Sequence, residues 1–173
     1  MTGVYPCALP PHALLQRYAR PSNHVDCDTT VLRSPATQAE FVEAFYTTAL
    51  FKVERTLLGW LVQRPAADHD AQQLSLGSVS SFSAWRVEAQ EPGQLMLCDF
   101  TGRTRSWLMA AADAGAAADG GTRLYFGSAV VPPQRRGVAA AGLGWPFHAL
   151  LEFHRLYSRL LLGAARSRLQ RRA

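Results

Sequence analysis

The sequence has few of the features that mark a catalytic, secreted or membrane-spanning protein. It contains no G-x-S-x-G nucleophile elbow, no glycine-rich phosphate loop with a lysine and no H-E-x-x-H zinc motif. Charged residues interrupt its longest apolar stretch, which excludes a spanning helix, and its N-terminus does not resemble a signal peptide. We therefore expect a cytoplasmic protein that holds no metal and no cofactor.

Lysine and cysteine are scarce as well. Lys52 is the only lysine, so the net charge of +5 comes almost wholly from arginine. Such a bias often reflects the base composition of a genome, and we predict no nucleic-acid partner from it. The three cysteines, Cys7, Cys27 and Cys98, are widely spaced and include no C-x-x-C pair. This spacing indicates neither a disulfide framework nor a zinc ribbon, and it fits a reducing compartment.

What the sequence does contain is the composition of one globular domain. Its 173 residues are 48% hydrophobic and 18% charged, which suffices for a single core. We divide the chain into an N-terminal arm, a single domain and a basic tail, spanning residues 1–22, 23–168 and 169–173.

Hydrophobic periodicity and turn residues predict the order of the elements. A first strand covers 25–32, and Thr37 with Glu40 forms a capping box that opens a helix. A second helix runs over 50–62, and 66–78 is interpreted as a loop. Four strands and one long helix follow, at 82–90, 95–100, 103–112, 122–131 and 145–168. This order predicts an α+β fold with a curved antiparallel sheet wrapped on the C-terminal helix.

The turns also predict a register for the central strands. A hairpin at Thr101 and Gly102 pairs Cys98 with Arg105 and Met96 with Trp107. Extension through the Pro92–Gly93 turn pairs Val87 with Cys98 and Trp85 with Phe100. One face then gathers apolar residues and two arginines, and alternation predicts that this face lies beneath the C-terminal helix: Trp85, Val87, Met96, Cys98, Phe100, Arg103, Arg105, Trp107 and Met109.

Three segments carry a resemblance to a known superfamily. They are Phe82–Glu88 with Glu91–Leu95, then Gly121–Leu124, then Pro146–His148 at the start of the last helix. Together they resemble the START-like, polyketide-cyclase (SRPBCC) superfamily, whose fold is the helix-grip. The nearest likeness is to an uncharacterised bacterial branch whose members can be fused to a short-chain-reductase-like domain. The resemblance implies a helix-grip fold and a cavity of ligand size, and it implies no reaction.

The leading hypothesis is therefore non-catalytic binding of a small, largely apolar molecule, with or without an acidic group, between the sheet and the C-terminal helix. Such pockets have apolar walls and few convergent polar groups. The candidate ligand-binding residues are Trp85, Met96, Cys98, Arg105, Trp107, Tyr125, Phe126, His154 and Tyr157.

Several alternatives stay open. Arg105 could hold a ligand carboxylate or phosphate, or it could reach the rim or stack on Trp107 as structural support. His154 or a cavity tyrosine could serve as the acid–base group of a cyclase- or isomerase-like enzyme. The arginine-rich C-terminus could contact a membrane surface, and a protein partner is a further alternative. His24, Asp26 and Asp28 alternate on one strand face, which we interpret as a solvated edge rather than a metal site. The glycine-rich stretch 137–144 is predicted to form a lid.

Overall fold

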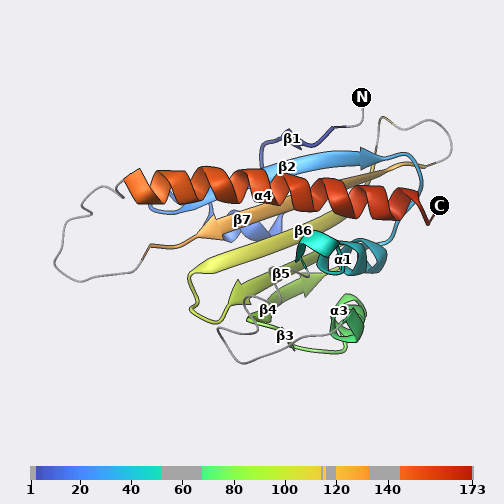
Figure 1. Ribbon diagram of the computed structural model, residues 1–173, viewed down its shortest axis with the longest axis horizontal. Helices are drawn as coiled ribbons and strands as arrows, with labels where there is room; N and C mark the ends of the chain where they lie inside the picture. The colour runs from blue at the N-terminus through green and yellow to red at the C-terminus, as the bar shows by residue number, and fades with distance from the viewer. Residues whose placement is uncertain (1–2, 52–67, 114, 116–119, 133–144, 173) are drawn as a thin grey trace.

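The computed structural model describes residues 3–51, 68–113, 115, 120–132 and 145–172, with side chains left out for 145–154. Its elements, in order, are β1 (Tyr5–Pro6), the 3-10 helix η1 (Leu14–Tyr18), β2 (His24–Leu32), α1 (Gln38–Tyr46), α3 (Asp68–Ser75), β3 (Ser81–Phe82), β4 (Trp85–Glu91), β5 (Gln94–Asp99), β6 (Thr104–Ala112), β7 (Thr122–Val130) and α4 (Trp145–Gln170). The strands form one antiparallel sheet in the order β1-β2-β7-β6-β5-β4-β3, and α4 runs along β2 and β7 (Figure 1). The predicted α+β class is confirmed.

The predicted capping box opens α1. Thr37 Oγ1 accepts a hydrogen bond from the Glu40 amide, and the Thr37 amide donates to the Glu40 carboxylate. Each side chain thus satisfies a backbone N–H that the first helical turn leaves unpaired. The second predicted helix begins in the described residues, since 49–51 are helical, but its remainder lies outside them, as does the predicted lid at 137–144.

One stretch interpreted as a loop is helical. Residues 68–75 form α3, with Asp68 and Asp70 in its first turn, where carboxylates stabilise the positive end of a helix dipole. Only Ala71 and Leu74 of this helix are buried. The apolar stripe is therefore too narrow to be recognised by periodicity, and the prediction of a loop was wrong for this reason.

Helices α1 and α4 cover one face of the sheet, which we call the helix face. Phe45 of α1 stacks on Phe126 of β7 with ring centroids 4.9 Å apart, and Leu162 of α4 is fully buried in the same cluster. The strands contribute a continuous apolar surface to this core: Leu32, Leu95, Leu97, Leu108, Leu124 and Phe126. From Ser158 to Leu169, the residues of α4 that point to the sheet are buried, so this half of the helix rests directly on the core.

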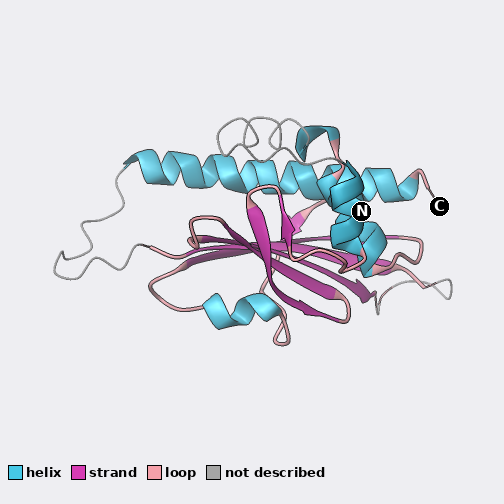
Figure 2. Cartoon of the chain, turned by 90° about the horizontal axis from the view of Figure 1, so that it is seen from below, coloured by secondary structure: helices cyan, strands magenta, loops and turns pink. Residues whose placement is uncertain are grey.

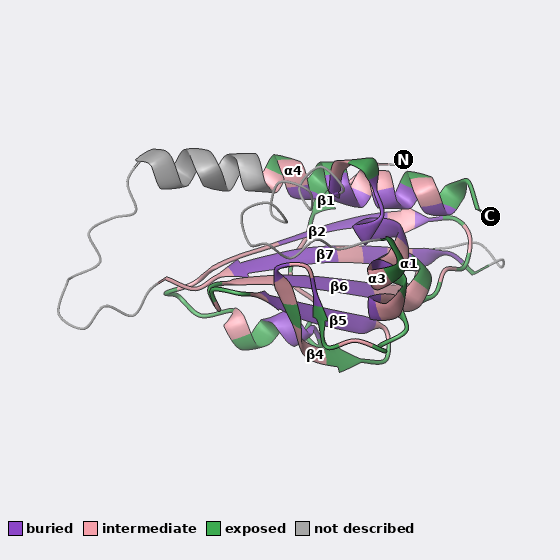
Figure 3. Ribbon diagram, turned by 60° about the horizontal axis from the view of Figure 1, so that its bottom comes forward, coloured by how far each residue is buried: buried purple, intermediate pink, exposed green. Residues whose placement is uncertain are grey.

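The second face of the sheet is covered by the N-terminal arm, and we call it the arm face. Figure 2 shows η1 on the side of the sheet opposite α4. Leu14 and Leu15 of η1 are buried against Met96, Trp107 and Met109. Gly127 makes this approach possible, because a Cβ atom there would lie 2.8 Å from Leu15 Cδ2. The central strands are consequently buried on both faces (Figure 3).

The register corrects the predicted face assignment. Met96 pairs with Trp107 and Cys98 with Arg105, as predicted. However, a bulge between Val87 and Ala89 shifts β4 by one residue, so Trp85 pairs with Asp99 and Val87 with Leu97. Trp85 and Val87 therefore belong to the helix face, whereas the Met96 and Trp107 side belongs to the arm face. The expectation that α4 covers the arginine-containing side of the sheet was wrong.

Three arginines near the C-terminus contact other parts of the fold. Arg166 Nε donates to the Val31 carbonyl and Arg168 Nη1 to the Thr47 carbonyl. Arg172 pairs with Glu43 of α1 at 2.9 Å. These contacts hold the last turns of α4 against β2 and α1, and α4 itself continues to Gln170.

Candidate functional site

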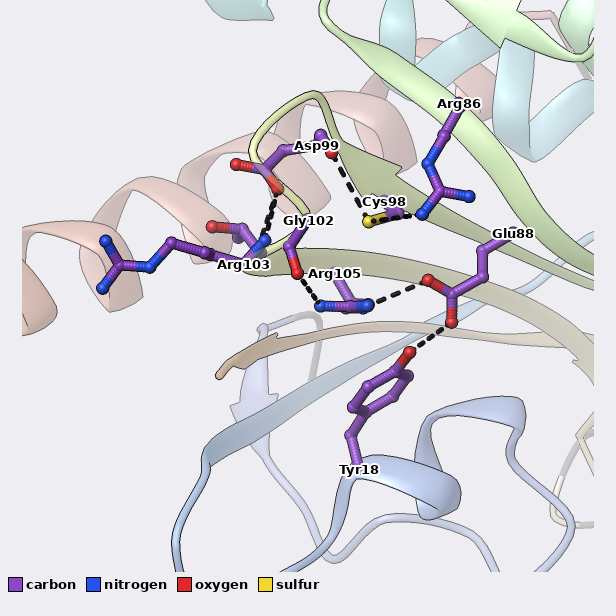
Figure 4. A network of polar contacts seen from close by, with 9 residues as sticks. Tyr18, Arg86, Glu88, Cys98, Asp99, Gly102, Arg103 and Arg105 are labelled. Atoms are coloured by element: carbon purple, nitrogen blue, oxygen red, sulfur yellow. Dashed lines mark hydrogen bonds and ion pairs between the residues drawn. The ribbon is translucent and has the colours of Figure 1, made fainter. Parts of the chain in front are cut away.

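Arg105 lies in a polar network on the arm face (Figure 4). Its Nε donates to the Glu88 carboxylate at 3.1 Å, and its guanidinium carbon lies 4.4 Å from the centre of the Tyr18 ring. The Tyr18 hydroxyl donates to the other Glu88 oxygen. The bulge in β4 positions Glu88 for both contacts, and η1 supplies Tyr18.

This network compensates the charge of Arg105 within the protein. The side chains of Arg105 and Glu88 are only 11% and 15% exposed. Burial lowers the pKa of Arg105, but Glu88, Cys98 and Tyr18 together outweigh burial and leave that pKa above its usual value. Burial and the hydrogen bond to Glu88 raise the pKa of Tyr18. The carboxylate that Arg105 holds is therefore Glu88, which favours the structural interpretation of this arginine over ligand binding.

The predicted ligand-binding residues do not share one cavity. Met96, Cys98, Arg105, Trp107 and Tyr125 lie on the arm face. Trp85, Phe126 and Tyr157 belong to the core of the helix face. The side chain of His154 lies outside the described residues, so its role stays a prediction.

Trp107, the largest of the candidate residues on the arm face, packs against the N-terminal arm instead of lining a cavity. Trp107 is fully buried, and its Nε1–H donates to Gln94 Oε1 at 2.9 Å. The same oxygen accepts the Leu14 amide, and Gln94 Nε2 donates to the His12 carbonyl. Gln94 thus joins β5, β6 and the arm through three hydrogen bonds, which makes Trp107 part of the arm's docking surface.

A groove of about 840 Å³ opens at the edge of the sheet. The short strand β1 pairs with Asp28 and Thr29 of β2, and the groove lies beyond the end of this pairing. We call it the edge groove. It is lined by three segments that are distant in the sequence: Pro6–Leu9 of the arm, Val25–Asp28 of β2, and Arg155, Leu156 and Arg159 of α4.

The edge groove combines apolar and charged groups. Arg159 Nε donates to the Asp28 carboxylate at 3.0 Å, and the Asp28 side chain is only 6% exposed. Asp26 Oδ1 accepts the hydroxyl and the amide of Ser128. Its second oxygen is buried and has no hydrogen-bond partner among the described residues, and His24 Nε2 lies 3.7 Å from it. A polar ligand atom or a water could satisfy it.

These positions also correct the interpretation of β2 as a solvated edge. Asp26 and Asp28 alternate on the helix face, where Phe126 and Ser128 are their cross-strand neighbours. Asp28 is 4% exposed and bound by a guanidinium group rather than by solvent. Within the described part of the chain, no group of three His, Cys, Asp or Glu residues could hold a metal ion.

Cys7 and Cys27 both line the edge groove. Their sulfur atoms are 3.3 Å apart and hydrogen-bonded. This hydrogen bond lowers the pKa of Cys7, whereas the same bond together with burial raises the pKa of Cys27. Burial also raises the pKa of Cys98. Sequence spacing could not reveal the pair, because it depends on the arm folding back beside β2.

We expect Cys7 to be the first cysteine that iodoacetamide alkylates in the native protein at neutral pH. The thiolate is the reactive form, and only Cys7 combines a lowered pKa with partial exposure. Peptide mass spectrometry over a time course would measure the order, with the unfolded protein as the control in which the three rates converge. Faster alkylation of Cys98 or Cys27 would contradict the assignment.

No protein-family model matches the sequence, and no curated protein is significantly similar to it. Among the described residues, no helix has the length and apolar character needed to cross a membrane.

Proposed function

We propose that this protein is a START-like binding module with a helix-grip fold. The proposal is supported by the order of the elements and by the open antiparallel sheet with α4 lying along it. It is also supported by the segments around Phe82–Leu95 and Pro146–His148 that resemble the superfamily.

The ligand we propose is a small amphipathic molecule, largely apolar with an acidic group, that the protein binds without converting it. The observation that carries this proposal is the edge groove, because its volume of about 840 Å³ is that of a small-molecule site. We place the ligand there because the described half of α4 packs directly on the core.

The walls of the edge groove suit such a molecule. Pro6, Leu9, Val25 and Leu156 offer apolar surface. Arg159 Nε donates a hydrogen bond to Asp28. The Arg159 side chain is nevertheless 44% exposed, so part of its guanidinium group remains accessible to a ligand carboxylate. The apolar part of the ligand would cover Leu156, which is 58% exposed.

Replacing Leu156 with glutamine should weaken binding of decanoate about fivefold, since loss of part of a buried leucine contact costs about 1 kcal/mol. Isothermal titration calorimetry would measure the dissociation constant. Leu160 is the matched control, because it is 54% exposed on the same helix and does not line the groove. Leu160→Gln should bind decanoate like the unchanged protein.

Two further comparisons test the details of this proposal. The alcohol 1-decanol, which lacks the carboxylate, should bind more weakly than decanoate, and equal affinities would contradict the acidic group. Decanoate should be recovered unchanged by mass spectrometry after incubation. Absence of saturable binding, or equal losses in both leucine variants, would refute the edge groove as the site.

A further inference from the structure

The two cysteines of the edge groove occupy directly opposed positions on neighbouring strands. Tyr5 pairs with Thr29 and Pro6 with Asp28, so the next position along β1 brings Cys7 opposite Cys27. The Cys7 amide donates to the Cys27 carbonyl at 2.9 Å, which continues the ladder for one more residue. Both side chains are free thiols.

This placement is compatible with a covalent bond. Opposed residues of antiparallel strands have Cα atoms about 4.5–5.5 Å apart, within the roughly 4.4–6.8 Å that disulfides span. The sulfur atoms are already 3.3 Å apart, so a bond requires only side-chain adjustment. Cys98 lies on β5, three strands away from β2 in the sheet order.

We propose that Cys7 and Cys27 form a reversible redox site, in which a hydroperoxide or a low-molecular-weight disulfide converts the dithiol into an intramolecular disulfide. The site does not depend on what occupies the edge groove. In a reducing compartment the dithiol is the resting state, and the disulfide forms when an oxidant enters.

With hydrogen peroxide the reaction proceeds in two balanced steps. The Cys7 thiolate attacks one peroxide oxygen, the O–O bond breaks, and water leaves once the departing oxygen is protonated, giving a sulfenic acid. Cys27 then attacks that sulfur, the S–S bond forms, and the sulfenic oxygen leaves as a second water. Two thiols have lost two electrons in total, and the peroxide has gained them.

The surroundings of the two residues suit these different roles. Cys7 is partly exposed and borders the groove, so an oxidant can reach it. The hydrogen bond with Cys27 lowers the pKa of Cys7, which favours the attacking thiolate. Cys27 is buried directly beside it, where a resolving thiol is needed.

Oxidation would link the N-terminal arm covalently to β2. The segment between the two cysteines includes η1, whose Leu14 and Leu15 cover the arm face. A disulfide would close this segment into a covalent loop and restrict the unfolded chain. We expect the midpoint of thermal unfolding to rise by roughly 5–10 °C.

The test uses the full chain, reduced and then treated with hydrogen peroxide or glutathione disulfide. After denaturation, alkylation of free thiols and digestion, mass spectrometry should find a peptide linked through Cys7 and Cys27 and an alkylated Cys98. Dithiothreitol should reverse the link and the thermal shift.

Single variants provide the controls. Cys98→Ser should retain the link, and Cys7→Ser and Cys27→Ser should lose both the link and the thermal shift. Separate oxidation of Cys7 and Cys27 to sulfinic or sulfonic acids in the unchanged protein, or links only between two molecules, would overturn the proposal.

Discussion

Replacing Arg105 with methionine is expected to lower the free energy of unfolding by about 2–4 kcal/mol, because a buried ion pair loses one partner. The substitution leaves the Glu88 carboxylate in a site that is 15% exposed, with Tyr18 as its remaining donor. It also removes the cation that lies 4.4 Å from the Tyr18 ring centre. Urea unfolding followed by circular dichroism would measure the loss.

The same substitution at Arg172 serves as the matched control. Arg172 pairs with Glu43 at a similar distance, 2.9 Å, but the two side chains are 44% and 28% exposed. Exposed pairs contribute up to about 1 kcal/mol, so Arg172→Met should have a small effect. Adding Glu88→Gln to Arg105→Met should recover part of the stability, because the unpaired charge is then removed. Equal losses for Arg105→Met and Arg172→Met would show that the network around Glu88 does not stabilise the fold.

Local chemistry made much of the fold predictable. The capping box at Thr37 and Glu40 marks the start of α1, and Pro92–Gly93 marks the β4–β5 turn, where Gly93 has a φ of 77°. Both signals depend on neighbouring residues only. The predicted bounds of β2, β5, β6 and β7 likewise agree closely with the structure, since strands and turns alternate clearly in this region.

The alternation of apolar and polar residues could not predict which face of the sheet α4 covers. Leu95, Met96 and Leu97 follow one another in β5, and Trp107, Leu108 and Met109 do so in β6. Both faces of these strands are therefore apolar, and the pattern does not say which one α4 covers. The structure resolves this ambiguity by burying both, one beneath the helices and the other beneath the arm. The predicted β4–β5 register was also wrong by one residue, because nothing in the local sequence indicates the bulge at Glu88.

The candidate site was hidden for a related reason. The edge groove depends on Pro6–Leu9, β2 and α4 lying side by side, although these segments come from opposite ends of the sequence. A proline-containing arm with little periodicity gives no sign that Cys7 will lie beside Cys27. Trp107, which the sequence suggested as a ligand-binding residue, is instead buried in the core beneath the arm.

Replacing Trp107 with alanine is expected to cost about 3–5 kcal/mol of unfolding free energy, the range for removing a large buried aromatic residue. Trp107 is fully buried and contacts the arm-face core from β6. Its loss leaves a cavity beneath Leu15 and removes one of the hydrogen bonds to Gln94. Chemical denaturation would measure the change.

Trp107→Ala should also loosen the docking of η1 on the arm face. Because Gln94 and Trp107 together hold η1, the Leu14 amide that donates to Gln94 should exchange faster with deuterium. Trp107→Phe is the control, since it keeps most of the volume and loses only the Nε1–H donor, for an expected cost of about 1–2 kcal/mol. If Trp107→Ala left exchange at Leu14 unchanged, the arm would be held by its other contacts, with β2 and the Tyr18–Glu88 hydrogen bond sufficient to dock it without the indole.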